Sequence, residues 1–235
     1  MRRKARYVTS ECTSCGECTK ACPEHRPNEF DAGLATRSAI YLPFAQAVPA
    51  AYLIDMDLCL NRGGVRVCEK CLAACERKCI DFGDRDREET IEAGTIVVAT
   101  GVDVFDASEL PQYRYGKAPN VITSLEFERL INAGGPTRGA LIRPSDHKTP
   151  KSVAFIQCVG SRSQKTNPYC SSVCCMNTIK DALLIKEHWP ETEIKVFYID
   201  IRAFGKGFED LFQRSKREGV QYIHCLLYTS PSPRD

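Results

Sequence analysis

Fourteen cysteines dominate the chemistry available to this 235-residue chain, and most of them stand in tight groups. Nine precede residue 83, and four more lie between residues 158 and 175. Cysteines two or three residues apart are poorly placed to pair with each other, and the start MRRKARYVTSEC has no apolar signal core, so a secreted disulfide scaffold fits badly. Metal ligation by thiolates in a reducing compartment fits better, which predicts a cytoplasmic protein with metal centres.

The first group, CTSCGECTKACP, places Cys12, Cys15, Cys18 and Cys22 before a proline. This is the C-x2-C-x2-C-x3-C-P run of bacterial ferredoxins, in which three cysteines hold one [4Fe–4S] cluster and the fourth reaches a second cluster. Gly16 lets the backbone approach the sulfides. Structural zinc sites use two separated pairs of ligands instead. The run therefore predicts iron–sulfur ligation.

The second group, CLNRGGVRVCEKCLAACERKC, supplies the other half of a two-cluster pattern, with a long gap between Cys59 and Cys68 that we interpret as a looped insertion around NRGG. The crossed ligation of such ferredoxins predicts one cluster on Cys12, Cys15, Cys18 and Cys75, and another on Cys59, Cys68, Cys71 and Cys22. Cys79 is then left over as a small buried residue. In an alternative assignment, Cys79 replaces Cys59.

The third group is Cys158, Cys170, Cys174 and Cys175, whose spacing matches no common zinc or ferredoxin pattern. Its placement is more informative, because Cys158 ends the predicted strand KSVAFIQCV and the adjacent pair opens the predicted helix that follows. Both ends would meet at the carboxyl edge of a sheet, where α/β proteins bind ligands. A helix N-terminus also favours an anionic cluster. We predict a third [4Fe–4S] site, against the alternative of half-buried thiols with one redox-active pair.

The segment TIVVATG predicts a strand over residues 95–99 that ends at Ala99, Thr100 and Gly101. In flavoproteins with two dinucleotide domains such a segment passes close to the flavin nucleotide, so these three residues are candidate FAD contacts. An ordinary buried strand and turn fits them equally well. The phosphate-binding G-x-G-x-x-G is absent from the chain, so most of any FAD site must lie outside it.

The elements that position these groups divide the chain into four predicted parts. Residues 1–85 form a ferredoxin-like module and residues 86–150 form part of an FAD domain, with a helix that begins at Ser124 as N-cap. Residues 151–225 alternate strand, helix, strand, helix, strand, with Gly219 closing the second helix, which predicts a parallel Rossmann-like βαβαβ unit. Residues 226–235, LLYTSPSPRD, resemble translated sequencing adapter or a disordered terminus.

Composition excludes several classes of function. Lys and Arg number 32 against 30 Asp and Glu, so the net charge of +2 gives no field for nucleic acid. The longest apolar stretch, residues 39–54, is too short to span a bilayer. The four histidines are scattered and form no metal-ligand spacing with one another.

Several segments together resemble the A subunit of heterodisulfide reductase from about residue 5 to residue 225: RYVTSECTSCGECTKACP, NEFDAGLATRSAIYLPFAQAVPAAYLID, IVVATG, PNVITSLEFERL, FIQCVGSR, NPYCSSVCCMNTIKDALLIKEH and FYIDIRAFGKGFEDLFQRSKREGV. The resemblance implies an internal fragment of an α/β protein. Its expected fold is a partial thioredoxin-reductase-like one (FAD/NAD(P)-binding, Rossmann-type) with an inserted α+β ferredoxin-like module.

The resemblance also implies a function. Members are FAD- and iron–sulfur-dependent oxidoreductase subunits that work with B and C subunits, with a hydrogenase or formate dehydrogenase as electron donor, and with ferredoxin. A fragment would pass electrons between FAD and [4Fe–4S] clusters without being a complete enzyme. Two alternatives are a structural zinc-binding interaction module and a thiol–disulfide oxidoreductase that uses Cys174 and Cys175.

Overall fold

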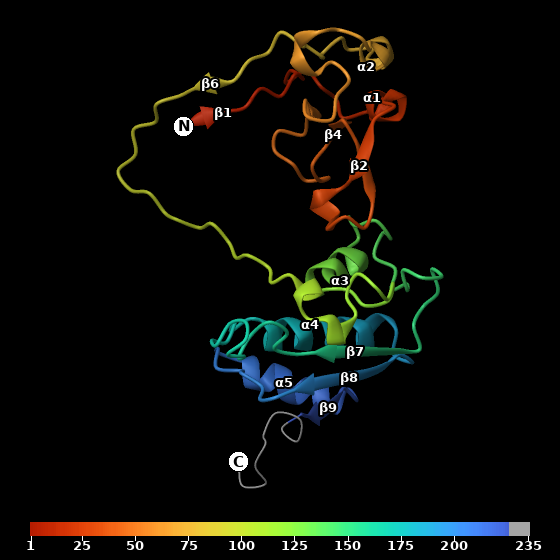
Figure 1. Cartoon of the computed structure of the whole chain (residues 1–235), viewed down its shortest axis with the longest axis vertical. Helices are drawn as coiled ribbons and strands as arrows, with labels where there is room; N and C mark the ends of the chain where they lie inside the picture. The colour runs from red at the N-terminus through yellow and green to blue at the C-terminus, as the bar shows by residue number, and fades with distance from the viewer. Residues whose placement is uncertain (226–235) are drawn as a thin grey trace. The chain divides into compact units, whose positions relative to one another are not determined.

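The computed structural model describes residues 1–225 and divides the chain into two compact units, Met1–Gly101 and the part from Val102 onward (Figure 1). The tail predicted at residues 226–235 lies outside the described residues. The sequence predicts a boundary between the first and second parts at residue 85, whereas the first compact unit extends to Gly101. The predicted division into four parts stays a prediction.

The first unit consists of short helices and two-stranded antiparallel sheets. Its sheets pair β1 with β6, β2 with β3, and β4 with β5. The elements in chain order are β1 (Arg2–Arg3), α1 (Glu17–Ala21), β2 (His25–Pro27), the 3-10 turn η1 (Glu29–Asp31), β3 (Thr36–Ser38), β4 (Ile40–Tyr41), β5 (Leu53–Ile54), the 3-10 turn η2 (Arg62–Gly64), α2 (Lys70–Ala74) and β6 (Arg87–Glu88).

Cysteine side chains form much of the core of this unit. The buried residues are Val8, Cys18, Ile40, Ile54, Cys71, Cys79 and Ile80. The helices α1 and α2 pack against each other, and each contributes one of the buried cysteines. A module of this size buries little aliphatic surface, so its packing depends on the same sulfur atoms that the sequence marks as ligands.

The second unit is built around a three-stranded parallel sheet in the order β7, β8, β9. Its elements are the 3-10 turns η3 (Ala107–Glu109) and η4 (Pro111–Tyr113), α3 (Ser124–Ile131), β7 (Ser152–Ile156), α4 (Cys174–His188), β8 (Glu193–Tyr198), α5 (Phe208–Arg217) and β9 (Gln221–His224). The predicted alternation of strands and helices after residue 150 is confirmed. A Rossmann-type fold for the whole remains a prediction.

The core of this unit lies between α4 and the sheet. Ala182 and Ile185 of α4 are fully buried with Ile194 and Val196 of β8, and α4 also packs against α3 and α5. In Figure 1, α4 runs along the strands, which lie side by side. A helix buried on several sides loses the simple one-sided pattern of a surface helix. In α4 even a polar residue, Asp181, is fully buried.

Two predicted details were wrong. The segment 95–99 is not a strand but an extended, exposed chain, because a strand forms only where a neighbouring strand completes its hydrogen bonds. Helix α3 has Thr123 rather than Ser124 as its N-cap: the Thr123 hydroxyl accepts from the Glu126 N–H, and the Glu126 carboxylate accepts from the Thr123 N–H. Gly219 follows the cap residue Glu218 of α5 with a left-handed φ of 86°.

Candidate iron–sulfur centres

The two ferredoxin-like motifs adopt matching local structures. Cys18 lies within α1 and Cys22 caps its end, while Cys71 lies within α2 and Cys75 caps its end. In each C-x3-C pair the first cysteine is helical, but the second, at the C-cap, has an extended backbone. The second side chain therefore leaves the helix face that carries the first, and the two cysteines border different cavities. Gly16 precedes α1 with a φ of 85°, a left-handed conformation that favours glycine. These short helices are the parts that distribute ligands between two sites.

The first cavity of this unit brings together the sulfur atoms predicted for one cluster. It has a volume of about 190 Å³ and is bordered by Cys12, Cys15, Cys18 and Cys75. Cys79, which the sequence left over, borders the same cavity. The first three residues come from the loop before α1 and from α1 itself, and Cys75 comes from the end of α2. This grouping of Cys75 with Cys12, Cys15 and Cys18 is the one that the crossed pattern predicts, and their role as cluster ligands stays a prediction.

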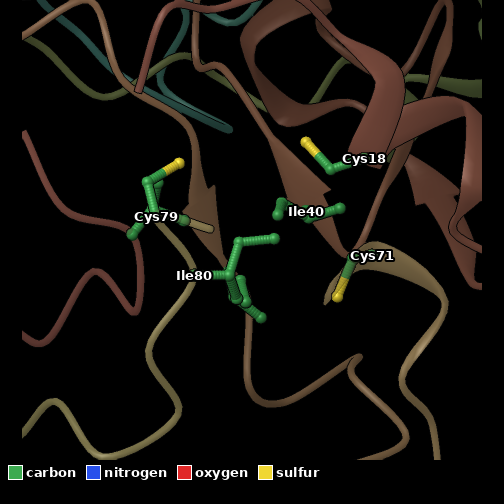
Figure 2. Close-up of a cluster of buried hydrophobic side chains, with 7 residues drawn as sticks. Cys18, Ile40, Cys71, Cys79 and Ile80 are labelled. Atoms are coloured by element: carbon green, nitrogen blue, oxygen red, sulfur yellow. The ribbon is translucent and has the colours of Figure 1, made fainter. Parts of the chain in front are cut away.

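The second cavity is bordered by Cys22, Cys59, Cys68 and Cys71, the other predicted set. It is smaller, about 20 Å³, which is room for roughly one water molecule. Ile40 borders both cavities. In Figure 2 the side chains of Ile40 and Ile80 lie between Cys71 and the pair Cys18 and Cys79. Cys59 borders this cavity and Cys79 borders the first one, which favours Cys59 over Cys79 as a ligand here. The choice between them stays a prediction.

Asn61 closes the long loop between Cys59 and Cys68. Its side chain is buried; Nδ2 donates to the Cys68 carbonyl at 2.8 Å, and Oδ1 accepts from the N–H groups of Val67 and Cys68, both at 2.9 Å. These bonds close the exposed turn around Gly63 at its base and hold Cys68 in the wall of the second cavity. Sequence reasoning missed Asn61, although an asparagine two residues after Cys59 at the start of a glycine turn was an available signal.

Burial makes these thiols costly to ionise without a partner cation. It raises the pKa of Cys18 and of Cys71 to about 11, and it also raises the pKa of Cys59. Backbone N–H groups oppose this effect, for example those of Thr19 toward Cys18 and Leu72 toward Cys71. Buried thiols with N–H donors aimed at sulfur are the donor set that iron–sulfur clusters use, because a bound cation stabilises the thiolate.

Cys75 and Cys79 form a close pair, with their Sγ atoms 3.5 Å apart. Burial opposes ionisation of Cys75, but the neighbouring backbone and thiol of Cys79 and the backbone of Lys78 lower its pKa overall. The Lys78 N–H donates to the Cys75 carbonyl oxygen at 3.1 Å. Burial together with the hydrogen bond to Cys75 raises the pKa of Cys79 to about 12. Cys75 is therefore the more acidic thiol of this pair, and Cys79 is the one that keeps its proton more readily.

The third group gathers at the carboxyl end of β7, as its placement predicted. Cys158 lies just beyond that strand, and Cys174 and Cys175 open α4. The thiols of Cys158 and Cys175 donate to Cys174 and lower its pKa, while the pKa values of the two donors rise. Cys170 lies close enough to act electrostatically on Cys175, and its Sγ accepts from the Ser172 N–H at 3.3 Å.

Arg162 is the charged residue beside this third group. Its guanidinium contacts Cys158 and forms an ion pair with Asp200 at 2.7 Å. Cys175 Sγ points to the Asp200 carbonyl oxygen at 3.7 Å. Two thiols beside Cys174, with a fourth nearby, fit a thiolate-ligated cluster by donor type. They fit a thiol-based redox site equally well.

The structure sets limits on other sites. Within residues 1–225, no three His, Cys, Asp or Glu side chains are placed to hold a single metal ion. The candidate flavin contacts Ala99, Thr100 and Gly101 lie in the exposed segment and border neither of the two cavities. No helix over the same range is long and apolar enough to cross a membrane.

Comparison with known proteins identifies close relatives. No protein-family profile matches the chain. It is 48% identical over 226 residues to the A subunit of the H(2):CoB-CoM heterodisulfide,ferredoxin reductase of Methanothermobacter marburgensis, covering 95% of this chain and 33% of the relative.

Two further relatives extend the comparison. The chain is 51% identical over 234 residues to the iron-sulfur A subunit of the CoB--CoM heterodisulfide reductase of Methanocaldococcus jannaschii, covering 97% of this chain and 35% of the relative. It is 40% identical over 251 residues to the A subunit of the Ferredoxin:CoB-CoM heterodisulfide reductase of Methanosarcina acetivorans, covering 95% and 31%. The chain thus spans about a third of the length of these relatives, and over that third it belongs to the family of heterodisulfide reductase A subunits.

Proposed function

We propose that this chain is an electron-transfer segment of a heterodisulfide-reductase-type oxidoreductase. In this proposal it holds [4Fe–4S] clusters that exchange electrons with a FAD bound largely by other parts of the full-length protein. The observation that carries the proposal is the convergence of two four-cysteine sets on two cavities that share Ile40 as a wall. The iron–sulfur wording in the name of a 51% identical relative supports it.

The residues of the chain have simple roles in this function. The cysteine thiolates of each set would bind iron, and the backbone N–H groups beside them would orient the sulfurs and stabilise their charge. Ile40 and Ile80 exclude water from the space between the cavities. When bound, such clusters accept and release single electrons. No side-chain acid, base or nucleophile is required in either cavity.

Partners are proposed from the names of the relatives. Those names include H2, formate, ferredoxin and F420H2 as electron sources or acceptors. We propose that the full-length protein likewise joins a complex with B and C subunits and a hydrogenase or formate dehydrogenase, and exchanges electrons with ferredoxin. The net charge of +2 gives this chain no strong electrostatic preference among such partners.

A second function is specifically favoured by the third group of cysteines. Cys174, activated by the thiols of Cys158 and Cys175, could act as a nucleophile on a disulfide acceptor. The Cys174 thiolate would attack one acceptor sulfur and release the other as a thiol. Cys158 would then attack the Cys174 sulfur of the resulting mixed disulfide and release the second acceptor sulfur as a thiol. The acceptor gains two electrons and two protons in all, and Cys158 and Cys174 become a disulfide.

Anaerobic reconstitution with iron and sulfide tests the main proposal. The unsubstituted chain should become brown, show iron–sulfur EPR signals on reduction, and bind about four irons at each of its three sites. Cys12→Ser and Cys68→Ser should each lose one cluster and leave the other, because the two residues border different cavities. Cys225→Ser, which changes a cysteine outside all three groups, is the control.

The outcomes separate the candidate functions. A colourless protein that binds zinc would overturn the electron-transfer proposal in favour of an interaction module. The double variant Cys174→Ser, Cys175→Ser should lose about four irons if the third group holds a cluster. Disulfide reduction that survives iron chelation but disappears in Cys174→Ser would instead identify a thiol–disulfide site there.

A further inference from the structure

A fifth thiol borders the first cavity, where a four-thiolate cluster has no ligand position for it. Cys79 is 4% exposed, and its Sγ lies 3.5 Å from Cys75 Sγ. Its backbone is fixed on both sides: the Thr9 N–H donates to the Cys79 carbonyl at 2.8 Å, and Ile80 forms a bridge with Val8. The direction of the Cys79 side chain is therefore set by the fold.

The surroundings of Cys75 explain what the extra thiol does. After Cys75 ends α2, the chain turns through Lys78, which has a left-handed φ of 50°. This turn is closed by the Lys78 N–H, which donates to the Cys75 carbonyl at 3.1 Å, and it brings the Cys79 Sγ atom within 3.5 Å of Cys75 Sγ. With Cys75 bound to iron as a thiolate, the Cys79 thiol is the side-chain donor placed against its sulfur.

We propose that Cys79 is a positioning residue for the first cluster and not one of its ligands. Its S–H donates a hydrogen bond to Cys75 Sγ, which fixes the direction of that ligand and raises the reduction potential of the bound cluster. The potential rises because each added electron makes the cluster more negative, and a donor to a ligand sulfur stabilises that charge. The inference rests on the proposed function of this cavity.

Three variants of the 235-residue chain test the inference after reconstitution with iron and sulfide. Cys79→Ala removes the donor, Cys79→Ser keeps a donor of similar size, and Cys225→Ser is the control. We expect Cys79→Ala to retain its iron and to lower one midpoint potential in an EPR-monitored redox titration. A change of up to about tenfold in the reduction equilibrium constant, or about 59 mV for one electron, is the expected range. Cys79→Ser should recover most of the shift.

Each other outcome has a definite meaning. Loss of about four irons in Cys79→Ala and Cys79→Ser would show that Cys79 is a ligand. Unchanged midpoints in Cys79→Ala, or equal shifts in the alanine and serine variants, would reduce its role to packing. Either result overturns this inference and leaves the electron-transfer proposal standing. Absence of iron from the unsubstituted chain would overturn both.

Discussion

Asn61 is the residue that allows a ferredoxin-like motif to contain eight residues between Cys59 and Cys68. Its three hydrogen bonds close the loop at its base, so the exposed residues beyond it do not disturb the position of Cys68. A buried side-chain amide whose oxygen and nitrogen are both hydrogen-bonded is strongly favoured, because buried polar groups without a partner cost free energy. The second cavity therefore depends on Asn61 in two ways. The Asn61 side chain borders the cavity, and it also holds the loop that carries Cys68.

Replacing this side chain should selectively weaken the second site. Asn61→Ala leaves the N–H groups of Val67 and Cys68 without their partner, at a cost of about 1–3 kcal/mol for each group that stays buried. We expect the reconstituted variant to lose about four irons, while signals from the first cavity persist. Iron analysis and EPR measure both effects.

Asn28→Ala is the matched control in the same unit, because Asn28 caps η1 through the Phe30 N–H and lies outside both cavity walls. It should lower stability without changing the iron content. Equal iron in Asn61→Ala and the unsubstituted chain would contradict the role given to Asn61.

At the residue scale, spacing predicted the two sets of four cysteines that border the cavities, but not the fifth cysteine of the first cavity. A C-x2-C-x2-C-x3-C run restricts the geometry so strongly that the grouping of Cys12, Cys15, Cys18 and Cys75 follows from it. The location of Cys79 could not be predicted in this way. It depends on the bridge between Val8 and Ile80, a contact between chain segments about 70 residues apart.

At the element scale, the contact between α3 and α4 contains a buried charge. Asp181 is fully buried; Asn177 Nδ2 donates to its Oδ2 at 3.2 Å, and Lys180 Nζ lies 3.1 Å from its Oδ1. Glu128 on α3 also faces this site through its ion pair with Lys180. Burial raises the pKa of Asp181 to about 6, against the partial opposing effect of Lys180.

This raised pKa gives stability a definite pH dependence. The folded state binds the Asp181 proton more tightly than the unfolded state, so its contribution is fully present below pH 4 and is lost as pH rises through about 6. A shift of about two units corresponds to about 3 kcal/mol. Between pH 4 and 7, the free energy of unfolding should therefore fall by up to about 3 kcal/mol more in the unsubstituted chain than in Asp181→Asn.

Chemical denaturation followed by circular dichroism at several pH values measures this difference. Asp210→Asn is the control, because Asp210 lies on the exposed side of α5. Its curve should run parallel to that of the unsubstituted chain. A parallel curve for Asp181→Asn as well would show that the carboxyl group is not protonated in the folded state at low pH.

Helices and strands with clear apolar periodicity could be predicted from the sequence. The exact residue at which each begins was harder to predict. Helices α4 and α5 and strands β7 to β9 follow from apolar periodicity, which is a property of the sequence itself. The start of α3 was misplaced by one residue because Thr123 and Ser124 are both good N-caps. Glu126, three residues after Thr123, completes a capping box and favours Thr123.

At the scale of the whole molecule, two apolar surfaces are left without a covering layer by residues 1–225. Ile96, Val97 and Val98 are each about 80% exposed (84%, 84% and 79%) in the segment that was predicted to be a strand. One face of the parallel sheet also carries exposed apolar groups, including Ile156 and Ile223. Parallel sheets are normally covered on both faces. The relatives are about three times as long as this chain, so residues outside it are available to provide the cover.

The segment 95–100 should therefore become a buried strand in the full-length protein. Strand formation needs partner strands to satisfy its backbone groups, and an isolated run of this length cannot supply them. We expect its amide hydrogens to exchange within seconds in the 235-residue chain. In the full-length protein, exchange should be at least about 100-fold slower, which corresponds to about 3 kcal/mol of opening free energy.

Hydrogen exchange with mass spectrometry compares the two proteins, and the central strand β8 provides the internal reference. Its peptides should be protected in both proteins, because β8 already has hydrogen-bonded neighbours on both sides. Equally fast exchange of residues 95–100 in both proteins would show that this segment is a linker. The proposed approach of Ala99, Thr100 and Gly101 to FAD would then lose its structural basis, since a flavin contact requires a segment held in place.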